Sequence, residues 1–103
     1  MAIGPTYRTV REEPSYAYCI ERLGGFARLD ELTGHLRWRL SRDPVSYSFQ
    51  LPGRETRLTF TEELRGVPVF RVFYRIVSDD LVSLLWIESV EDAPPFGFDD
   101  WLG

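Results

Sequence analysis

Arg71 and Arg75 both lie in the run FRVFYRI, which covers residues 70–76. The run is rich in β-branched and aromatic residues, so it is predicted to be a strand. Side chains alternate between the two faces of a strand, so both arginines are expected on the same face. A guanidinium group stays protonated and is planar, so it can clamp a phosphate but is a poor proton acceptor. The spacing therefore offers a phosphate clamp rather than a general base.

The sequence contains no lysine, so every basic side chain except His35 is an arginine. This excludes a lysine general base, Schiff-base chemistry and the lysine of a phosphate-binding loop. The formal net charge is −4, which is the wrong sign for binding nucleic acid by overall electrostatic attraction. No basic residue follows Arg75, so a local positive patch is expected only in the first three-quarters of the chain.

Other side chains that could do chemistry have structural alternatives. His35 is the one group that titrates near neutrality without a shift, but its place on a helix favours a surface position over a general base. Cys19 falls on an apolar helix stripe and is interpreted as core filler. As the single cysteine, it excludes an intrachain disulfide and a cysteine-based metal cluster. Asp79 and Asp80 are assigned to a turn, so neither a metal nor a cofactor is predicted.

The order of elements positions these residues. The length of 103 residues suits one domain over 1–103, with 91–103 as a C-terminal tail that either docks a partner or frays. Two N-terminal helices are expected to cover one face of a small antiparallel sheet, which gives an α+β fold of order β-α-α-β-β-β. The last strand is apolar on both faces, so it is expected inside the sheet.

The expected elements are a strand at 7–10, a helix from 12–15 to 24–25 with Pro14 near its start, a helix over about 26–40, a less regular stretch at 45–54, a strand at 56–61 and a hairpin over 67–90. The apolar stripes are expected at Tyr16, Cys19, Ile20 and Leu23 of the first helix and at Leu29, Leu32, Leu36 and Leu40 of the second. The charged residues of the second helix are expected to be mainly solvated, namely Arg28, Glu31, Arg37 and Arg39.

The hairpin sequence carries a family resemblance. Residues 70–76 (FRVFYRI), the acidic turn and residues 84–87 (LLWI), together with the helix end at 36–44 (LRWRLSRDP), resemble the RelE/ParE superfamily of bacterial type II toxins. The resemblance covers roughly residues 7–90. It implies a toxin that inhibits growth and is neutralised by a cognate antitoxin. Members of the family include ribosome-dependent mRNA endonucleases (mRNA interferases) and poisons of DNA gyrase.

The resemblance also implies a set of site residues. Arg71 matches the family arginine on the third strand, and Arg57 falls where the second strand often carries a basic residue. The resemblance also leads one to expect a basic residue at the position of Thr59. Together Arg57 and Arg71 would grip the scissile phosphate from one face of the sheet, with Tyr74 in a positioning role. Arg65 and Arg75 are candidates for nucleic-acid binding. The alternative is that these arginines lie on a solvated face or pair with acids, for which the candidates are Glu55, Glu62, Glu63 and Glu88.

Two functions follow from this interpretation. The first is a toxin that cleaves mRNA on the ribosome. The second is a noncatalytic interaction module, or a gyrase-inhibitor-like toxin, on the same fold. The sequence ESVED at 88–92 favours the second, because family nucleases often carry basic residues there. No apolar run approaches the ~20 residues needed to cross a bilayer, and the N-terminal sequence lacks the features of a secretory signal. A cytoplasmic protein is therefore expected.

Overall fold

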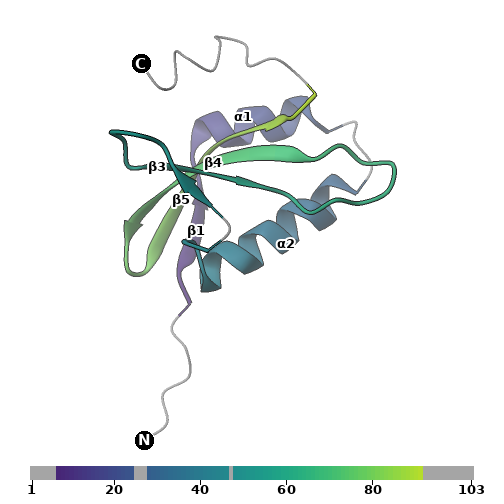
Figure 1. Cartoon of the computed structure of the whole chain (residues 1–103). Coiled ribbons are helices and arrows are strands. Elements are labelled where there is room, and N and C mark those ends of the chain that lie inside the picture. Colours follow the sequence, from purple (N-terminus) through teal and green to yellow (C-terminus); the bar gives the residue numbers. More distant parts are fainter. Residues whose placement is uncertain (1–6, 25–27, 47, 92–103) are drawn as a thin grey trace, which may run out of the picture.

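The computed structural model describes residues 7–24, 28–46 and 48–91. Two helices and five strands lie within these ranges, so the predicted α+β class is confirmed (Figure 1). Most of the expected tail, from residue 92 onward, lies outside the described residues. The elements are β1 (Thr9–Glu12), α1 (Pro14–Arg22), α2 (Leu29–Arg42), β2 (Phe49–Gln50), β3 (Thr56–Phe60), β4 (Phe70–Ser78) and β5 (Leu81–Ser89).

The five strands form one mixed sheet in the order β1-β5-β4-β3-β2. The strands from β2 to β5 pair antiparallel, as expected. The expectation of a wholly antiparallel sheet is wrong at β1, which lies parallel to β5 with Thr9 opposite Leu81. The direction of β1 relative to β5 depends on how the two helices connect β1 to the rest of the sheet. The residue pattern of a short edge strand carries no information about this direction. The short strand β2 was also missed, since it falls in a stretch that was expected to be irregular.

The predicted hairpin is confirmed as β4 and β5, which are joined at Asp79–Asp80. Its register shifts between Phe73, which faces Trp86, and Tyr74, which faces Leu84. The shift leaves Leu85 as an extra residue in β5, which is the signature of a β-bulge. The bulge explains why β5 is apolar on both faces, since the alternation of its side chains changes phase at this point.

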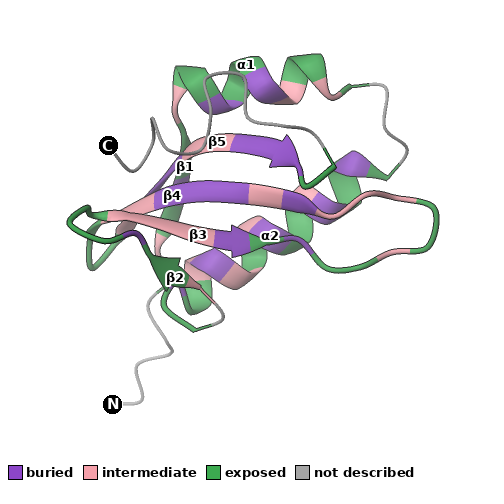
Figure 2. Cartoon of the chain, turned by 45° about the horizontal axis from the view of Figure 1, so that its top comes forward, coloured by how far each residue is buried: buried purple, intermediate pink, exposed green. Residues whose placement is uncertain are grey.

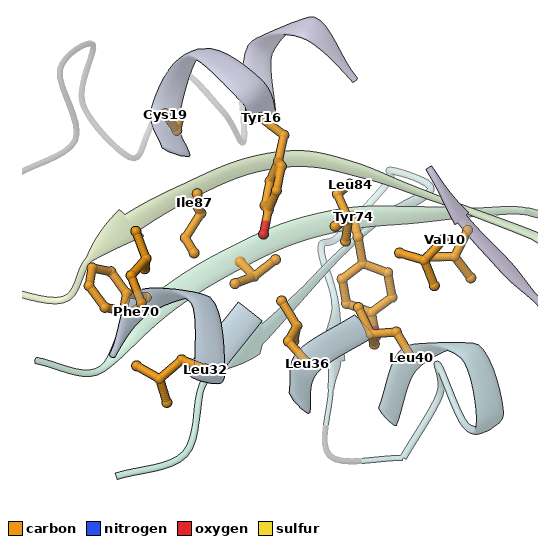
Figure 3. Close-up of a cluster of buried hydrophobic side chains, with 13 residues drawn as sticks. Val10, Tyr16, Cys19, Leu32, Leu36, Leu40, Phe70, Tyr74, Leu84 and Ile87 are labelled. Carbon is orange, nitrogen blue, oxygen red and sulfur yellow. The ribbon is translucent and has the colours of Figure 1, made fainter. Parts of the chain in front are cut away.

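Both helices pack on the same face of the sheet. The helix stripes predicted from the sequence are confirmed, because Tyr16 and Cys19 of α1 are buried, as are the leucines of α2 at 29, 32, 36 and 40. Pro14 occupies the first turn of α1, where the lack of an N–H has no cost. Figure 3 shows α1 and α2 side chains meeting over β4 and β5. The buried cluster consists of Val10, Tyr16, Cys19, Leu29, Leu32, Leu36, Leu40, Phe70, Val72, Tyr74, Val82, Leu84 and Ile87.

Two tyrosine hydroxyls enter this core in different ways. The hydroxyl of Tyr16 is buried and has no hydrogen-bond partner among the described residues, whereas the hydroxyl of Tyr74 donates to the Pro44 carbonyl. Tyr16→Phe is therefore expected to leave the free energy of unfolding unchanged or slightly higher, because no bond is lost. Tyr74→Phe leaves the carbonyl of the buried Pro44 without its hydrogen-bond donor. It should therefore lower the free energy of unfolding by about 1–3 kcal/mol. Urea unfolding of the two variants measures the change in the free energy of unfolding for each. Equal changes would contradict the assignment of a hydrogen bond to the Tyr74 hydroxyl and of none to the Tyr16 hydroxyl.

Candidate functional site

Arg57 and Tyr74 lie side by side on neighbouring strands. They are direct partners in the register of β3 and β4, so both side chains lie on the face of the sheet that the helices cover. Arg57 is half-buried, and its Nε donates to the Ser48 hydroxyl at 3.1 Å. Tyr74 is fully buried, and its hydroxyl reaches the carbonyl of Pro44, just beyond the end of α2. The structure therefore brings two of the three predicted catalytic residues together.

A second guanidinium group joins them from α2. The Nη2 of Arg39 donates to the Thr59 hydroxyl at 3.0 Å and to the Phe60 carbonyl at 3.1 Å. Thr59 is two residues along β3 from Arg57, on the same face. The resemblance implies a basic residue at position 59, and here an arginine of the facing helix occupies that place. The sequence predicts that Arg39 is solvated, because the stripe of α2 gives no sign of which off-stripe residue reaches the sheet.

We call Arg39, Ser48, Arg57 and Tyr74 the Arg57 cluster. Burial raises the pKa of the Tyr74 hydroxyl, while the nearby Ser48, Arg57 and Arg39 side chains oppose that shift. The hydroxyl therefore stays protonated at neutral pH and acts as a hydrogen-bond donor. The cluster combines two permanent cations with two hydroxyls, which is a set suited to an anion such as a phosphate.

The raised pKa values of Tyr16 and Tyr74 predict a loss of stability at high pH. Below about pH 10 both hydroxyls are neutral in the folded and unfolded chains. The contribution of these two groups to stability therefore does not change with pH in this range. Above that, the unfolded chain releases these protons and the folded chain retains them, because burial raises both pKa values. Unfolding then becomes more favourable as the pH rises. Urea unfolding at about pH 8 and about pH 10.5 should show the loss, and Tyr16→Phe should reduce it.

Arg71 lies on the opposite face of the sheet from Arg57. It alternates with Val72, which packs under the helices. Its Nε lies 3.2 Å from the Glu88 carboxylate, and its Nη2 donates to the Ser89 carbonyl at 3.3 Å. The two side chains are only 18% and 8% exposed. The pairing with Glu88 that the sequence offered as an alternative is thus present, and the expectation that Arg57 and Arg71 share one face is wrong.

Arg75 lies on the face of Arg71, as the alternation of the strand predicted, and faces Ser83 on β5. The Ser83 hydroxyl donates to the Glu13 carboxylate, and this bond is the main cause that lowers the pKa of Glu13. Arg11 also reaches both groups, with its Nη2 2.9 Å from Glu13 and 3.2 Å from Ser83. Arg65 is exposed in the connection between β3 and β4. Neither predicted nucleic-acid-binding arginine is among the residues of the Arg57 cluster.

The remaining candidates have surface roles among the described residues. His35 is exposed on α2, with its ring stacked against Trp38 and its Nδ1 3.7 Å from a Glu62 oxygen. Asp80 accepts a hydrogen bond from Ser78 within the hairpin turn. In the described part of the chain, no three metal-ligating side chains gather into a group, and no helix has the length and apolar character to cross a membrane.

Comparison of the sequence and structure with family models, curated proteins and solved structures finds no match. The function is therefore inferred from the geometry of the Arg57 cluster and from the resemblance carried by the hairpin sequence.

Proposed function

We propose that the chain is a RelE/ParE-like toxin whose Arg57 cluster binds a phosphate of mRNA and promotes its cleavage on the ribosome. The observation that carries the proposal is the convergence of Arg57 and Arg39 with the Ser48 and Tyr74 hydroxyls. The N-terminal helix pair packed on a sheet that ends in a long hairpin also agrees with what the resemblance implies.

In this mechanism a ribose 2′-hydroxyl attacks the adjacent phosphorus and loses its proton to water, so that a 2′,3′-cyclic phosphate forms. The bond to the 5′-oxygen of the next nucleotide breaks, and this oxygen takes a proton from water. Negative charge accumulates on the phosphate oxygens during the attack. The guanidinium group of Arg57 offsets this charge, since its planar set of N–H donors matches the geometry of a phosphate. The neutral Tyr74 hydroxyl, fixed by Pro44, helps to hold the Arg57 side chain in place. Arg71 takes no part in this chemistry, because its partner is Glu88 on the other face.

A noncatalytic interaction module is the second candidate, and a specific observation favours it. The end of β5 presents Glu88 and Glu91 where the resemblance leads one to expect basic residues, and Glu88 is already bound to Arg71. Such a protein would act by binding, either to a cognate antitoxin or to a target such as DNA gyrase.

Inducible expression in a bacterial host separates these functions. The toxin proposal predicts growth arrest, relief of arrest when the adjacent open reading frame is co-expressed, and new mRNA ends that depend on the ribosome. Arrest without new mRNA ends would favour the gyrase-inhibitor-like function, and in vitro supercoiling by gyrase would then be measured. Normal growth at verified expression of the folded chain would contradict both toxin functions.

A further inference from the structure

A row of planar side chains runs along α2. His35, Trp38 and Arg42 are spaced three and four residues apart, so they lie on one face of the helix. The rings of His35 and Trp38 are stacked, with 6.2 Å between the ring centres and an angle of 11° between the planes. The Cζ atom of Arg42 lies 4.2 Å from the centre of the Trp38 ring and 4.0 Å from that of Tyr7, which precedes β1. We call these four residues the aromatic row.

The rings of the aromatic row are open to solvent and do not belong to the core. Trp38 is 55% exposed and Tyr7 is 50% exposed. The buried stripe of α2 consists of leucines at other positions, and Figure 2 shows exposed parts of the helix, in green, beside the buried parts, in purple. Aromatic rings bury large areas when a flat partner stacks on them. The row therefore presents a surface that a flat ligand can cover.

The charges around the aromatic row favour an anion at one of its ends. The Nη1 of Arg42 donates to the Trp38 carbonyl at 3.1 Å and to the Ser41 hydroxyl at 3.0 Å, and both of these acceptors are neutral. In the part of the chain that the structure describes, no carboxylate forms an ion pair with Arg42. At the other end, a Glu62 oxygen lies 3.7 Å from the His35 Nδ1. A phosphate is therefore expected beside Arg42 and away from His35.

The aromatic row adjoins the Arg57 cluster through α2. Arg39 lies four residues after His35 and three before Arg42, so it neighbours both on the helix surface, with about 5–6 Å between Cβ atoms. Its Nη2 reaches the Thr59 hydroxyl on β3, where it joins the cluster. A stacked nucleic-acid strand advances about 3.4 Å per nucleotide. One strand can therefore place a phosphate at the cluster and neighbouring bases on the row.

We propose that the aromatic row binds bases of single-stranded RNA by stacking, beside the phosphate held at the Arg57 cluster. Every base has a flat π surface, so stacking on Trp38 requires no particular sequence. Arg42 adds a cation that attracts both a base and a phosphate. Stacking does not depend on the overall charge, so it suits a chain with a net charge of −4. The inference rests on the proposed function, because that function places RNA at the neighbouring cluster.

Binding of RNA to the full-length chain at fixed ionic strength tests the base contacts. The first probe is a single-stranded 2′-O-methyl RNA of roughly ten nucleotides, which resists cleavage because it has no free 2′-hydroxyl. The second probe is an abasic oligonucleotide of the same length, which keeps the phosphates and lacks the bases. The wild-type chain should bind the first probe about 10-fold more tightly than the second. Equal affinities would overturn the proposal without the need for any substitution.

Substitutions at Trp38 then assign the base contacts to the aromatic row. Trp38→Leu is expected to weaken binding of the first probe about 10-fold and to leave binding of the abasic probe unchanged. Trp38→Phe keeps a flat ring and should retain most of the affinity. Tyr18→Leu is the matched control, because Tyr18 is 52% exposed on α1 and has the Arg22 guanidinium group 5.6 Å from its ring centre. It should bind both probes as the wild type does. An equal change for both probes in Trp38→Leu would overturn the proposal.

Cleavage of mRNA on ribosomes separates this inference from the proposed function. If both hold, Trp38→Leu should raise KM several-fold with little change in kcat, because a stacked base contributes equally to binding in the ground state and the transition state. Cleavage with an unchanged KM in this variant would overturn the base-stacking role and support the proposed function. Base-dependent RNA binding without cleavage would contradict the proposed function and support the base-stacking role.

Discussion

Arg57→Ala is expected to reduce RNA cleavage by about 100-fold or more, which corresponds to roughly 2.7 kcal/mol of lost transition-state stabilisation. In the proposed mechanism, Arg57 is the member of the Arg57 cluster that offsets the charge on the phosphate, and the chain has no lysine to replace it. The side chain of Arg57 is half-buried, where its Nε donates to the Ser48 hydroxyl and its guanidinium group lies beside the Tyr74 hydroxyl. The fold should therefore tolerate the change, and the loss should appear in activity rather than in stability.

The measurement is the rate of appearance of cleaved mRNA on purified ribosomes, with urea unfolding of the same samples. Arg22→Ala is the matched control, because Arg22 is exposed on α1 and contacts Tyr18 rather than a residue of the Arg57 cluster. It should cleave at the wild-type rate. Arg57→Lys keeps the charge but loses the fork that matches a phosphate, so an intermediate rate is expected. Wild-type cleavage by a stably folded Arg57→Ala chain would exclude the proposed role.

Arg71→Ala is expected to destabilise the protein by about 3–5 kcal/mol, because it leaves the buried Glu88 carboxylate without its cation. One oxygen of this carboxylate, Oε2, is already buried without a hydrogen-bond partner among the described residues. The Ser89 carbonyl also loses the donor that Arg71 provides. At roughly 4–8 °C per kcal/mol for a domain of this size, the Tm should fall by tens of degrees.

Thermal and urea unfolding measure this effect, and a paired substitution tests its cause. Replacing both partners, Arg71→Leu with Glu88→Leu, removes the charge and its counter-charge together, so it should restore most of the stability lost in Arg71→Ala. A double variant no more stable than Arg71→Ala would show that the loss does not come from an unpaired carboxylate.

These two predictions assign different roles to arginines that the resemblance places in one site. A loss of toxicity in Arg71→Ala is expected to follow the loss of folded protein. A loss of toxicity in Arg57→Ala is expected while the protein remains folded. Measuring stability beside activity for both variants is therefore necessary before either arginine is assigned to catalysis.

The sequence alone determined the features that depend on local periodicity. The alternation in 70–76, the acidic turn and the second apolar run predicted the hairpin, and the leucine spacing in α2 predicted its buried stripe. Proline at position 14 indicated the start of α1. These signals are local because a side chain's face follows from its position within one strand or helix.

The tertiary structure alone decided which arginines meet. Arg57 and Arg71 lie on different strands, and the connection at 61–69 between them does not fix a register from its sequence. A slip of one residue would reverse the face of every side chain in β3, so the pairing of Arg57 with Tyr74 decides that Arg57 lies with the helices and away from Arg71. The approach of Arg39 and the parallel pairing of β1 depend on helix packing, which joins residues far apart in the chain and leaves no periodic mark in the sequence.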